Sequence, residues 1–492
     1  MKVAGCLIVG SILCCAACGG VAESVAPPGG TSLPALEELD AGWSTLRPGG
    51  DTICSLGTEY SFFARPADTD RLLIYLQGGG ACWMGENCDP DSRPTYSRHV
   101  DESDNPAHRP TGIFDLENPA NPIADYSMVM IPYCTGDVHI GDRVATYPVE
   151  PEGGEPYEVT IRHNGYVNVM SVLDWVFDNF DSPAEIFLAG SSAGSIPAPF
   201  YAQIVAEHYA DARVVALGDG SGTYRRDADE EQDDPTVTWN TLQVLKQHAG
   251  YQDLTQEELG YHDLYVVAGR QHPELRLYQY DSAHDAVQGF YLRLSGVNDP
   301  DLSALIKSNR NDIRAQISNF AAYTAGGPEH TILWRPAFYQ YEVDGLLFRD
   351  WVKALLAGET VEDIDCDRCS RPELHYNEAD QQIIERTMEL LGDGGAWIGH
   401  DEGSCPEASD EDGEAGWSLR CALQQATGEV KGNARAWSAA QLDLRLESAA
   451  RLADIDPRTS LREYNNHAST RFQDIESLLH TVADRIASHG QH

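Results

Sequence analysis

The sequence predicts an α/β fold, in which a mainly parallel sheet carries helices on both faces, followed by a small helical domain. Between about residues 41 and 370, short apolar runs alternate with amphipathic helical stretches, as in sheets whose strands are joined by crossover helices. Beyond about residue 371, strand-like runs vanish and helical periodicity takes over. We therefore expect an α/β domain over residues 41–370 and a separate helical domain over 376–490.

The individual elements follow from the same patterns. Polar or small residues stand after several of the predicted strands, and ligands bind at the carboxyl ends of parallel strands. Gly78, Cys134, Ser192 and Asp219 are therefore expected to gather along one edge of the sheet. The clearest strands are 72–76, 127–131, 185–188 and 214–217, and the clearest helices are 167–179 and 197–209.

The C-terminal segment contains one strongly amphipathic helix. Its apolar residues repeat every three or four positions between 471 and 486, which places them on a single face. Such a stripe is typical of core packing rather than of a ligand site. The stripe consists of Phe472, Ile475, Leu478, Leu479, Val482 and Ile486.

The charge of the chain excludes some partners. The 492 residues include 34 Lys and Arg against 77 Asp and Glu, a formal net charge of −43. So acidic a surface repels nucleic acid and anionic membranes, and we expect neither as a partner. Acidic runs such as 229–231 and 410–412 are interpreted as solvated loops. The sequence makes no prediction of the oligomeric state.

The segment 1–18 has the pattern of a bacterial lipoprotein signal peptide. Lys2 supplies a positive start, 7–13 form an apolar run too short to span a bilayer, and CAAC ends at Cys18, the predicted lipid-bearing residue. Cys15 stands where this motif usually has Leu, so plain secretion is the alternative. Both interpretations place the mature protein outside the cytoplasm, with membrane contact only through an N-terminal lipid. Residues 19–40, rich in Gly, Pro, Ser and Ala, are predicted to be a flexible tether.

Eight cysteines follow the leader, and an even number in an exported chain suggests disulfides. Zinc is the alternative for the C-x-x-C sequence at 366–369. No second cysteine pair lies nearby at zinc-finger spacing, so we expect no metal site. The three close pairs and the remaining pair are predicted to be Cys82–Cys88, Cys366–Cys369, Cys405–Cys421 and Cys54–Cys134.

The segment IFLAGSSAGSIPAPFY, residues 186–201, has the pattern of a nucleophile elbow. An apolar run ends in G-x-S-x-G with Ser192 at its centre, and a helical stretch follows. The elbow strains the backbone of its central residue, and small neighbours avoid clashes with the adjacent strand and helix. Ser192 is therefore the candidate nucleophile. The alternative is a strand-to-helix turn without chemistry.

A serine nucleophile needs a base, a group that orients the base, and donors for the oxyanion. The triplet Gly78-Gly79-Gly80 follows the predicted strand RLLIYLQ. Three glycines let backbone N–H groups turn inward without side-chain obstruction, as in the HGGG-type motif of esterases. With the N–H of Ala193, they are candidates for the oxyanion hole. A tight turn after a strand is the alternative.

The base is expected to be a histidine downstream of Ser192, as in the chain order of hydrolases. His330 lies in the loop GGPEHT, ahead of the apolar run ILW, and a loop at a sheet edge suits a triad histidine. The acid is open at this point among Asp219, Asp281 and Asp285. The other histidine candidates are His208, His248, His262, His272 and His284.

These motifs, in this order, resemble the pectin acetylesterase/Notum family of carboxylesterases over roughly residues 50–370. Members of that family are α/β-hydrolases with a Ser-Asp-His triad, and they need no cofactor. The resemblance rests on LIYLQGGGACW, IPYCTGDVHIGD, GSSAGS, the DAVQ segment at 285–288, GGPEHTIL, and VDGLLFRDWVKALLAG with Cys366 and Cys369.

The resemblance implies that Ser192 is the nucleophile, Asp285 the acid and His330 the base. Asp285 is preferred because the family's acid precedes a Gln by three positions, as Asp285 precedes Gln288. The family more often has an aromatic residue at position 287, so Asp281 stays the alternative acid. The family also often has Cys at position 191, where this chain has Ser.

The resemblance further implies an exported serine carboxylesterase that forms an acyl-enzyme on Ser192. Its substrate would be an O-acetyl group on a polysaccharide. The family also includes enzymes that remove a fatty acyl group from protein, so a protein or lipid deacylase is one alternative. A non-catalytic cell-surface binding protein on the same scaffold is another. The oxyanion hole would be formed by Gly79, Gly80 and Ala193.

The helical segment 376–490 weakly resembles a small bacterial domain of unknown function. The resemblance rests on GAWI at 395–398, CALQQA at 421–426 and YNNH at 464–467. It implies no activity for this segment.

Overall fold

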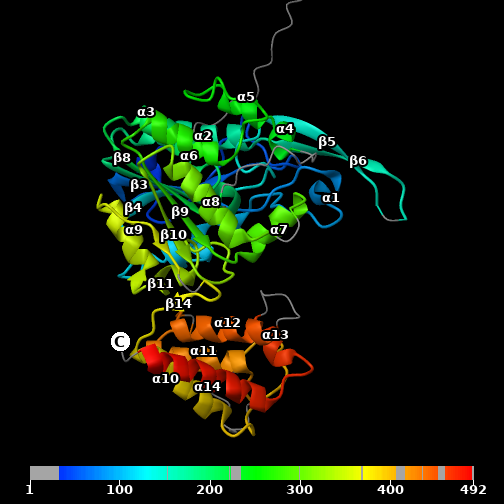
Figure 1. Cartoon of the computed structure of the whole chain (residues 1–492), viewed down its shortest axis with the longest axis vertical. Helices are drawn as coiled ribbons and strands as arrows, with labels where there is room; N and C mark the ends of the chain where they lie inside the picture. The colour runs from blue at the N-terminus through cyan, green and yellow to red at the C-terminus, as the bar shows by residue number, and fades with distance from the viewer. Residues whose placement is uncertain are drawn as a thin grey trace, which may run out of the picture. The chain divides into compact units, whose positions relative to one another are not determined.

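The protein is described from a computed structural model (Figure 1). Residues 33–492 belong to one compact unit. The predicted signal peptide, Cys18 and residues 19–32 of the predicted tether lie outside the described residues, as do the acidic runs at 229–231 and 410–412. The structure describes residues 33–151, 153–220, 222, 234–297, 300–366, 369–405, 416–434, 436–452 and 460–489.

A nine-stranded sheet lies at the centre of the α/β part, with the order β1-β2-β4-β3-β7-β8-β9-β10-β13 (Figure 1). Every pairing from β4 to β13 is parallel, whereas β2 pairs antiparallel with both β1 and β4. The predicted α/β fold with a mainly parallel sheet is thus confirmed. The strands are β1 (Ser44–Leu46), β2 (Phe62–Arg65), β3 (Asp68–Leu76), β4 (Tyr126–Ile131), β7 (Glu185–Ser191), β8 (Arg213–Asp219), β9 (Arg276–Ser282), β10 (Phe320–Ala325) and β13 (Ile364–Asp365).

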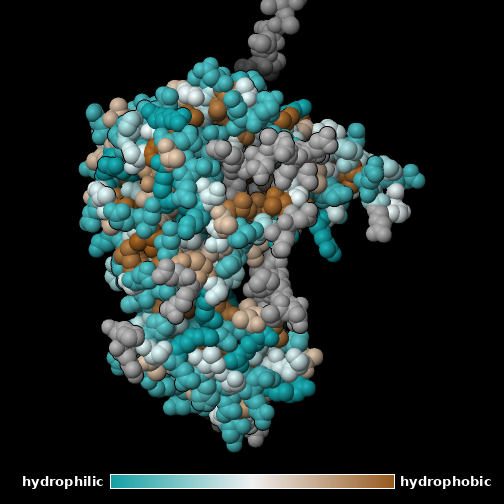
Figure 2. All heavy atoms as spheres, viewed as in Figure 1, coloured by the Kyte–Doolittle hydropathy of each residue, from teal (hydrophilic) through white to brown (hydrophobic). Residues whose placement is uncertain are grey.

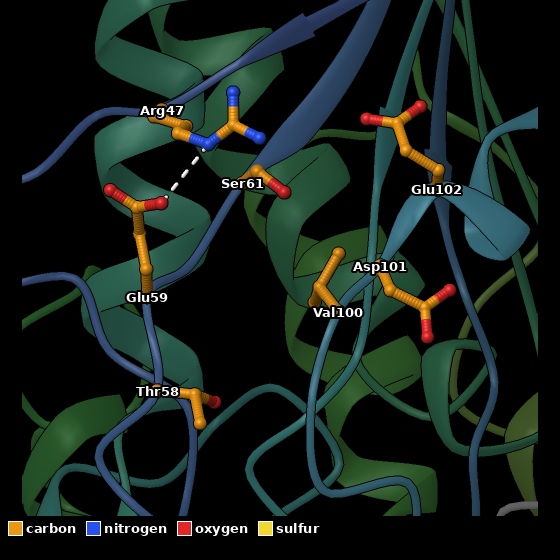
Figure 3. A pocket seen from close by; sticks show the side chains of 7 residues that line it. All are labelled: Arg47, Thr58, Glu59, Ser61, Val100, Asp101 and Glu102. Carbon is orange, nitrogen blue, oxygen red and sulfur yellow. Dashed lines mark hydrogen bonds and ion pairs between the residues drawn. The ribbon is translucent and has the colours of Figure 1, made fainter.

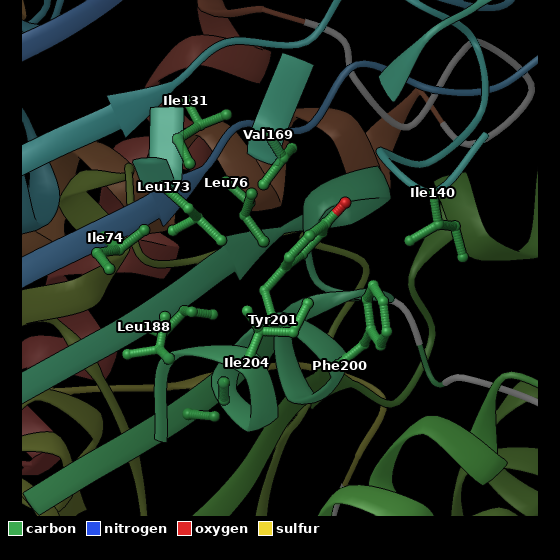
Figure 4. Packing of buried hydrophobic residues seen from close by; sticks show 14 of the residues in the cluster. Ile74, Leu76, Ile131, Ile140, Val169, Leu173, Leu188, Phe200, Tyr201 and Ile204 are labelled. Atoms are coloured by element: carbon green, nitrogen blue, oxygen red, sulfur yellow. The ribbon is translucent and has the colours of Figure 1, made fainter. Parts of the chain in front are cut away.

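Alternate residues of the central strands enter two different cores, because successive side chains of a strand point to opposite faces. Leu72 and Ile74 of β3 pack with α2 (Gly165–Asn179), α3 (Ala198–His208) and α6 (His262–Gln271). Figure 4 shows this core, where Leu173 of α2 and Ile204 of α3 are grouped with apolar strand residues.

The opposite face of the sheet has its own buried cluster. Leu73 and Tyr75 of β3 pack there with Phe348 and Trp351 of α9 (Phe348–Leu356). Helices therefore cover both faces of the sheet, as the alternation of strands and helices predicts. On the outside, hydrophilic side chains dominate the face shown in Figure 2, in line with the high charge of the chain.

Several further elements surround the sheet, and they were not among the clearest strands and helices expected from the sequence. A hairpin and a three-stranded sheet, β12-β11-β14, lie outside the main sheet. These elements are β5 (Arg143–Val149), β6 (Tyr157–His163), β11 (Tyr341–Val343), β12 (Leu346–Leu347), β14 (Glu373–Leu374), α1 (Gly85–Cys88), α4 (Pro235–Thr238), α5 (Thr241–Leu245), α7 (Ala286–Leu294) and α8 (Leu302–Arg314).

The C-terminal segment is helical, as predicted, and has a separate buried cluster. The apolar stripe of the last helix enters this cluster through Ile475, Leu478, Leu479, Val482 and Ile486. Among the described helices, none has the length and hydropathy needed to cross a membrane. The helices are α10 (Glu378–Leu391), α11 (Leu419–Lys431), α12 (Ala439–Arg451), α13 (Leu461–Asn466) and α14 (Phe472–His489). The boundaries 41–370 and 376–490 stay a prediction.

The eight cysteines form four disulfides, in the pairs that the sequence suggests. Two of them fix the loops that follow strand ends, because Cys134 follows β4 and Cys82 follows the glycine triplet after β3. The bonds are Cys54–Cys134, Cys82–Cys88, Cys366–Cys369 and Cys405–Cys421.

The predicted tether differs from the structure at its C-terminal end. Leu36, in the short 3-10 helix Leu36–Glu38, is buried in the core beside α2. Its N–H donates to Asn179 Oδ1 at 2.7 Å, and Trp175 Nε1 donates to the carbonyl of Pro34 at 3.0 Å. The expectation of a flexible tether is therefore wrong for 34–38. Composition signalled flexibility, but one buried leucine and two hydrogen bonds fix this stretch.

We predict that Leu36→Ala lowers the free energy of unfolding by about 2 kcal/mol, because it removes a buried side chain from the core. The exposed neighbour provides the control, and Glu37→Ala is expected to change stability by less than about 0.5 kcal/mol. Urea unfolding followed by fluorescence measures both values. Equal stabilities for the two variants would show that 34–38 is not part of the folded core.

Candidate active site

Ser192 stands at a tight turn between β7 and α3 and has a left-handed backbone, with φ at +55°. A non-glycine residue in this conformation is strained. The turn is possible because its two glycines lack side chains. A Cβ on Gly190 would lie 2.1 Å from the carbonyl oxygen of Gly194, and a Cβ on Gly194 would lie 2.2 Å from that of Leu76. The G-x-S-x-G pattern therefore forms the strand–turn–helix geometry of an elbow.

His330 joins Ser192 to Asp285 by two short hydrogen bonds. Its Nε2 lies 2.7 Å from Ser192 Oγ, and its Nδ1 lies 2.7 Å from Asp285 Oδ2. Ser192 and His330 are partly accessible, whereas Asp285 is buried. The three residues come from the ends of β7, β9 and β10, which lie at the carboxyl edge of the parallel sheet.

Asp285 is held as the N-cap of α7. Its Oδ1 accepts the N–H groups of Val287 at 2.8 Å and Gln288 at 3.1 Å, and the side chain of Gln288 donates to Oδ2 at 3.0 Å. Both carboxylate oxygens therefore have donors, and Oδ2 remains directed at His330. The Gln three positions after the aspartate has a clear physical purpose, because it fixes the carboxylate.

Asp281, the alternative acid, has other hydrogen-bond partners than His330. Its Oδ2 accepts from Arg310 Nη2 at 2.8 Å, and each of these side chains is 1% exposed. Its Oδ1 accepts from Gln288 Nε2 at 2.8 Å and from the N–H of Gly222 at 3.0 Å. Asp281 thus forms a buried ion pair behind the site, and Gln288 links it to Asp285.

The charges around His330 favour its protonated form. Burial alone lowers the pKa of the imidazole, but the charge and hydrogen bond of Asp285 outweigh burial, and the charge of Asp219 adds to them. Arg335 opposes them, and the net effect is a raised pKa. An imidazole of this kind accepts a proton from a neighbouring hydroxyl readily.

The glycine triplet passes directly beside Ser192. A Cβ on Gly78 would lie 2.7 Å from Ser192 Cβ, and one on Gly79 would lie 2.5 Å from the ring of Tyr133. Gly80 has φ at +78°, and a Cβ there would lie 2.0 Å from the carbonyl oxygen of Thr95. Close approach therefore requires glycine at all three positions. Within the described residues, the N–H groups of Gly79, Gly80 and Ala193 make no hydrogen bond.

A strained turn that the sequence pattern did not mark supports the glycine triplet. Val138 and His139 both have positive φ, at 49° and 62°. His139 Nε2 lies 2.8 Å from the carbonyl oxygen of Gln77, the residue that precedes the triplet. Burial lowers the pKa of His139 to about 4, so its ring is neutral and donates from Nε2. The hydroxyl of Tyr133 accepts the N–H of Val138 at 2.8 Å.

A second supporting network lies under the elbow. Ser191 Oγ accepts from the hydroxyl of Tyr75 at 2.7 Å and donates to Asp219 Oδ2 at 2.6 Å. Asp219 also accepts the N–H groups of Ile332 and Leu333, each at 2.9 Å. Burial raises the pKa of Asp219 to about 6. Asp219 therefore ties the elbow to the segment just after His330, a role that its position after a strand did not reveal.

The remaining histidine candidates lie in other surroundings. His208 stacks on Phe177 with ring centroids 3.9 Å apart, and Nε2 of His248 lies 2.9 Å from the hydroxyl of Tyr166. His272 pairs with Glu274, His262 is buried at the start of α6, and His284 is exposed.

Within the described residues, no group of three His, Cys, Asp or Glu side chains has the arrangement of a metal site. A pocket of about 360 Å³ has an ion pair at one side, where Arg47 Nε lies 3.0 Å from Glu59 Oε2 (Figure 3). None of the residues around Ser192 lines this pocket, whose lining is Arg47, Thr58, Glu59, Ser61, Val100, Asp101 and Glu102.

The chain is similar to known proteins in both sequence and structure. Residues 48–260 match the pectinacetylesterase family. A stretch of 154 residues is 28% identical to the palmitoleoyl-protein carboxylesterase Notum of Schmidtea mediterranea, and this match covers 29% of the chain and only 26% of that relative's length. Among solved structures, the Wnt deacylase Notum from Drosophila matches with a TM-score of 0.45 and 17% identity, over 64% of this chain and 94% of that chain.

Proposed function

We propose, from the premise that residues 48–260 belong to the pectinacetylesterase family, that this chain is an exported serine carboxylesterase. Ser192 is the nucleophile, His330 the base and Asp285 the acid. The observation that carries the proposal is the continuous chain of two 2.7 Å hydrogen bonds from Ser192 through His330 to Asp285. These residues stand at the end of parallel strands, where a substrate reaches them.

The reaction proceeds in two halves. His330 Nε2 takes the proton of Ser192 Oγ as that oxygen attacks the ester carbonyl, and Asp285 stabilises the imidazolium that forms. The N–H groups of Gly79, Gly80 and Ala193 donate to the oxyanion. The alcohol leaves with the proton from His330, and an acyl group remains on Ser192. Water then attacks the acyl group and gives a proton to His330, which returns it to Ser192 Oγ as the acid is released.

The substrate class that we propose is an O-acetyl ester on a polysaccharide. The family match over 48–260 supports it, because the family is described by an acetylesterase activity. The four disulfides support a place outside the cytoplasm, where such polysaccharides occur. Anchoring through a lipid on Cys18 is part of the same proposal.

A second candidate function is the removal of a longer acyl chain, and one surface feature favours it. Helix α7, which begins directly after Asp285, carries Val287, Phe290 and Leu294 on one side at helical spacing. Phe290 is 43% exposed, and Figure 2 shows hydrophobic side chains gathered over the region of α7. An apolar surface next to the triad suits an apolar acyl group.

We predict that p-nitrophenyl acetate is hydrolysed with a higher kcat/KM than the octanoate ester. Hydrolysis rates over the series from acetate to decanoate, below the solubility limit of each ester, measure the preference. A steady rise of kcat/KM with chain length would contradict the acetyl assignment and support the longer acyl chain. Phe290→Ser would then be expected to reduce the rate for octanoate and to leave that for acetate unchanged.

We predict that Ser192→Ala abolishes turnover of p-nitrophenyl acetate and that Asp285→Asn lowers kcat by about 10⁴-fold, as loss of the acid does in a comparable triad. Asp281→Asn is the matched comparison. It leaves the buried charge of Arg310 with only the longer ion pair to the exposed Asp365, at 4.0 Å, so it is expected to lower stability by about 3 kcal/mol with little change in kcat of the folded fraction.

Steady-state kinetics and urea unfolding of the three variants separate these effects. Turnover that persists in Ser192→Ala would contradict the esterase mechanism, and so would a wild-type protein that does not hydrolyse p-nitrophenyl acetate. Equal, small losses of kcat in the two aspartate variants would contradict the assignment of Asp285. Full turnover in Asp285→Asn, together with loss of turnover in Asp281→Asn, would identify Asp281 as the acid instead.

We predict that kcat/KM falls as pH decreases through a pKa above the ordinary 6.5 of histidine, because the base must be neutral and the net effect of its surroundings raises the pKa of His330. Asp285→Asn removes the largest raising influence, so the acid limb of the residual activity should move to lower pH. A pH series of kcat/KM between 5 and 9 tests this, and an unmoved limb would exclude His330 as its source.

A further inference from the structure

Helix α12 contacts the loop that carries His330. Arg445, on α12, forms an ion pair with Glu329, the residue that directly precedes His330. The carboxylate of Glu329 is 15% exposed and the guanidinium side chain of Arg445 is 40% exposed, so the pair is partly shielded from water. The contact places a charge of the C-terminal helices one residue from the candidate base.

A second connection starts at the other end of this loop. Residues 369–372 run against its two glycines: the N–H of Gly327 donates to the carbonyl of Cys369 at 2.8 Å. A Cβ on Gly326 would lie 2.2 Å from the carbonyl oxygen of Arg371, so the two backbones are in contact. The disulfide Cys366–Cys369 closes the segment on its N-terminal side. The loop therefore rests on the backbone around Arg371.

The side chain of Arg371 is in turn held by α12. It forms ion pairs with Asp443 and, at 3.2 Å, with Glu447, one turn further along the helix. Arg485 of α14 contacts the same two carboxylates, and the hydroxyl of Tyr376 donates to Asp443 at 2.7 Å. The side chain of Asp443 is fully buried. An ionic cluster built on a buried carboxylate, in which each charge has an opposite partner, has a defined geometry.

Apolar contacts accompany these charges. Ala439 and Leu442 of α12 are buried in the same hydrophobic cluster as Tyr339 and Tyr341 of the α/β part. Helix α12 is therefore packed into the α/β core on one side, while Ala440 and Leu444 pack among the C-terminal helices on the other.

We propose that the C-terminal helices position the histidine of the triad, with α12 holding the His330 loop at both of its ends. Arg445 and Arg371 are the positioning residues. The proposal rests on the proposed function, since it assigns residues 376–489 a role in that same reaction. It gives the helical segment a purpose that its sequence did not suggest.

The physical reason lies in the composition of the loop. Gly326 and Gly327 give the loop more backbone freedom than other residues would. A mobile loop would displace His330, which must stay within hydrogen-bond distance of both Ser192 and Asp285 to act as the base. A misplacement of about 1 Å costs up to 10²-fold in rate. The ion pair on Glu329 and the backbone contacts at Gly326 and Gly327 restrict this freedom.

We predict that Arg445→Ala lowers kcat for p-nitrophenyl acetate by about tenfold with little change in KM, because the loop moves while the substrate surface stays in place. Arg445→Lys should recover part of the loss. Glu329→Gln should cause a similar loss, and the double variant should lose no more than either single variant, because both changes break the same contact.

The matched control is Arg386→Ala. Arg386 of α10 also forms ion pairs on the C-terminal helices, with Glu389 of α10 and Glu429 of α11, and neither partner belongs to α12 or to the His330 loop. Both arginine variants should lower Tm by a small amount, since ion pairs of an arginine that is about 40% exposed contribute little, while only Arg445→Ala should lower kcat. Unchanged kcat in Arg445→Ala, with wild-type turnover intact, would overturn the positioning role and leave the esterase proposal standing. Absent turnover in wild type would overturn the esterase proposal itself.

Discussion

The left-handed backbone of Ser192 is the constraint on which the rest of the site depends. With φ at +55°, the residue projects from the turn between β7 and α3. The conformation is tolerated because Gly190 and Gly194 allow strand, turn and helix to approach within distances that no side chain would permit. The strain is balanced by the surrounding sheet, in which β7 pairs in register with β3 and β8 along its length.

Around this turn, a parallel sheet places the ends of neighbouring strands side by side. The loop after β3 brings the glycine triplet, that after β9 brings Asp285, and that after β10 brings His330. Buried polar groups then fix each loop: His139 holds Gln77, Asp219 holds the amides after His330, and Gln288 holds Asp285. Each is a short-range interaction, yet together they connect segments that are far apart in sequence.

The features that depend on local sequence were predictable, and those that depend on tertiary partners were not. Apolar runs predicted β3, β4, β7 and β8, and the 3.6-residue period predicted α14, because each pattern is a direct consequence of backbone geometry. The choice between Asp281 and Asp285 was different. Asp281 lies at the end of β9 and Asp285 just after it, and their difference arises from Arg310 of α8, which pairs with Asp281 alone of the two. The burial of Leu36 was unpredictable for the same reason: it lies in a Gly- and Pro-rich segment, and only the tertiary contact with α2 makes it part of the core.

In the proposed mechanism, Ser192 attacks the ester with His330 as its base. The most direct test is peptide mass spectrometry after reaction with a serine-directed fluorophosphonate. We expect one adduct, on the peptide that contains Ser192, and at least a hundredfold slower labelling in His330→Asn, since loss of a triad member costs about 10⁴-fold or more. An adduct on another serine, or ester hydrolysis that survives complete labelling of Ser192, would contradict it.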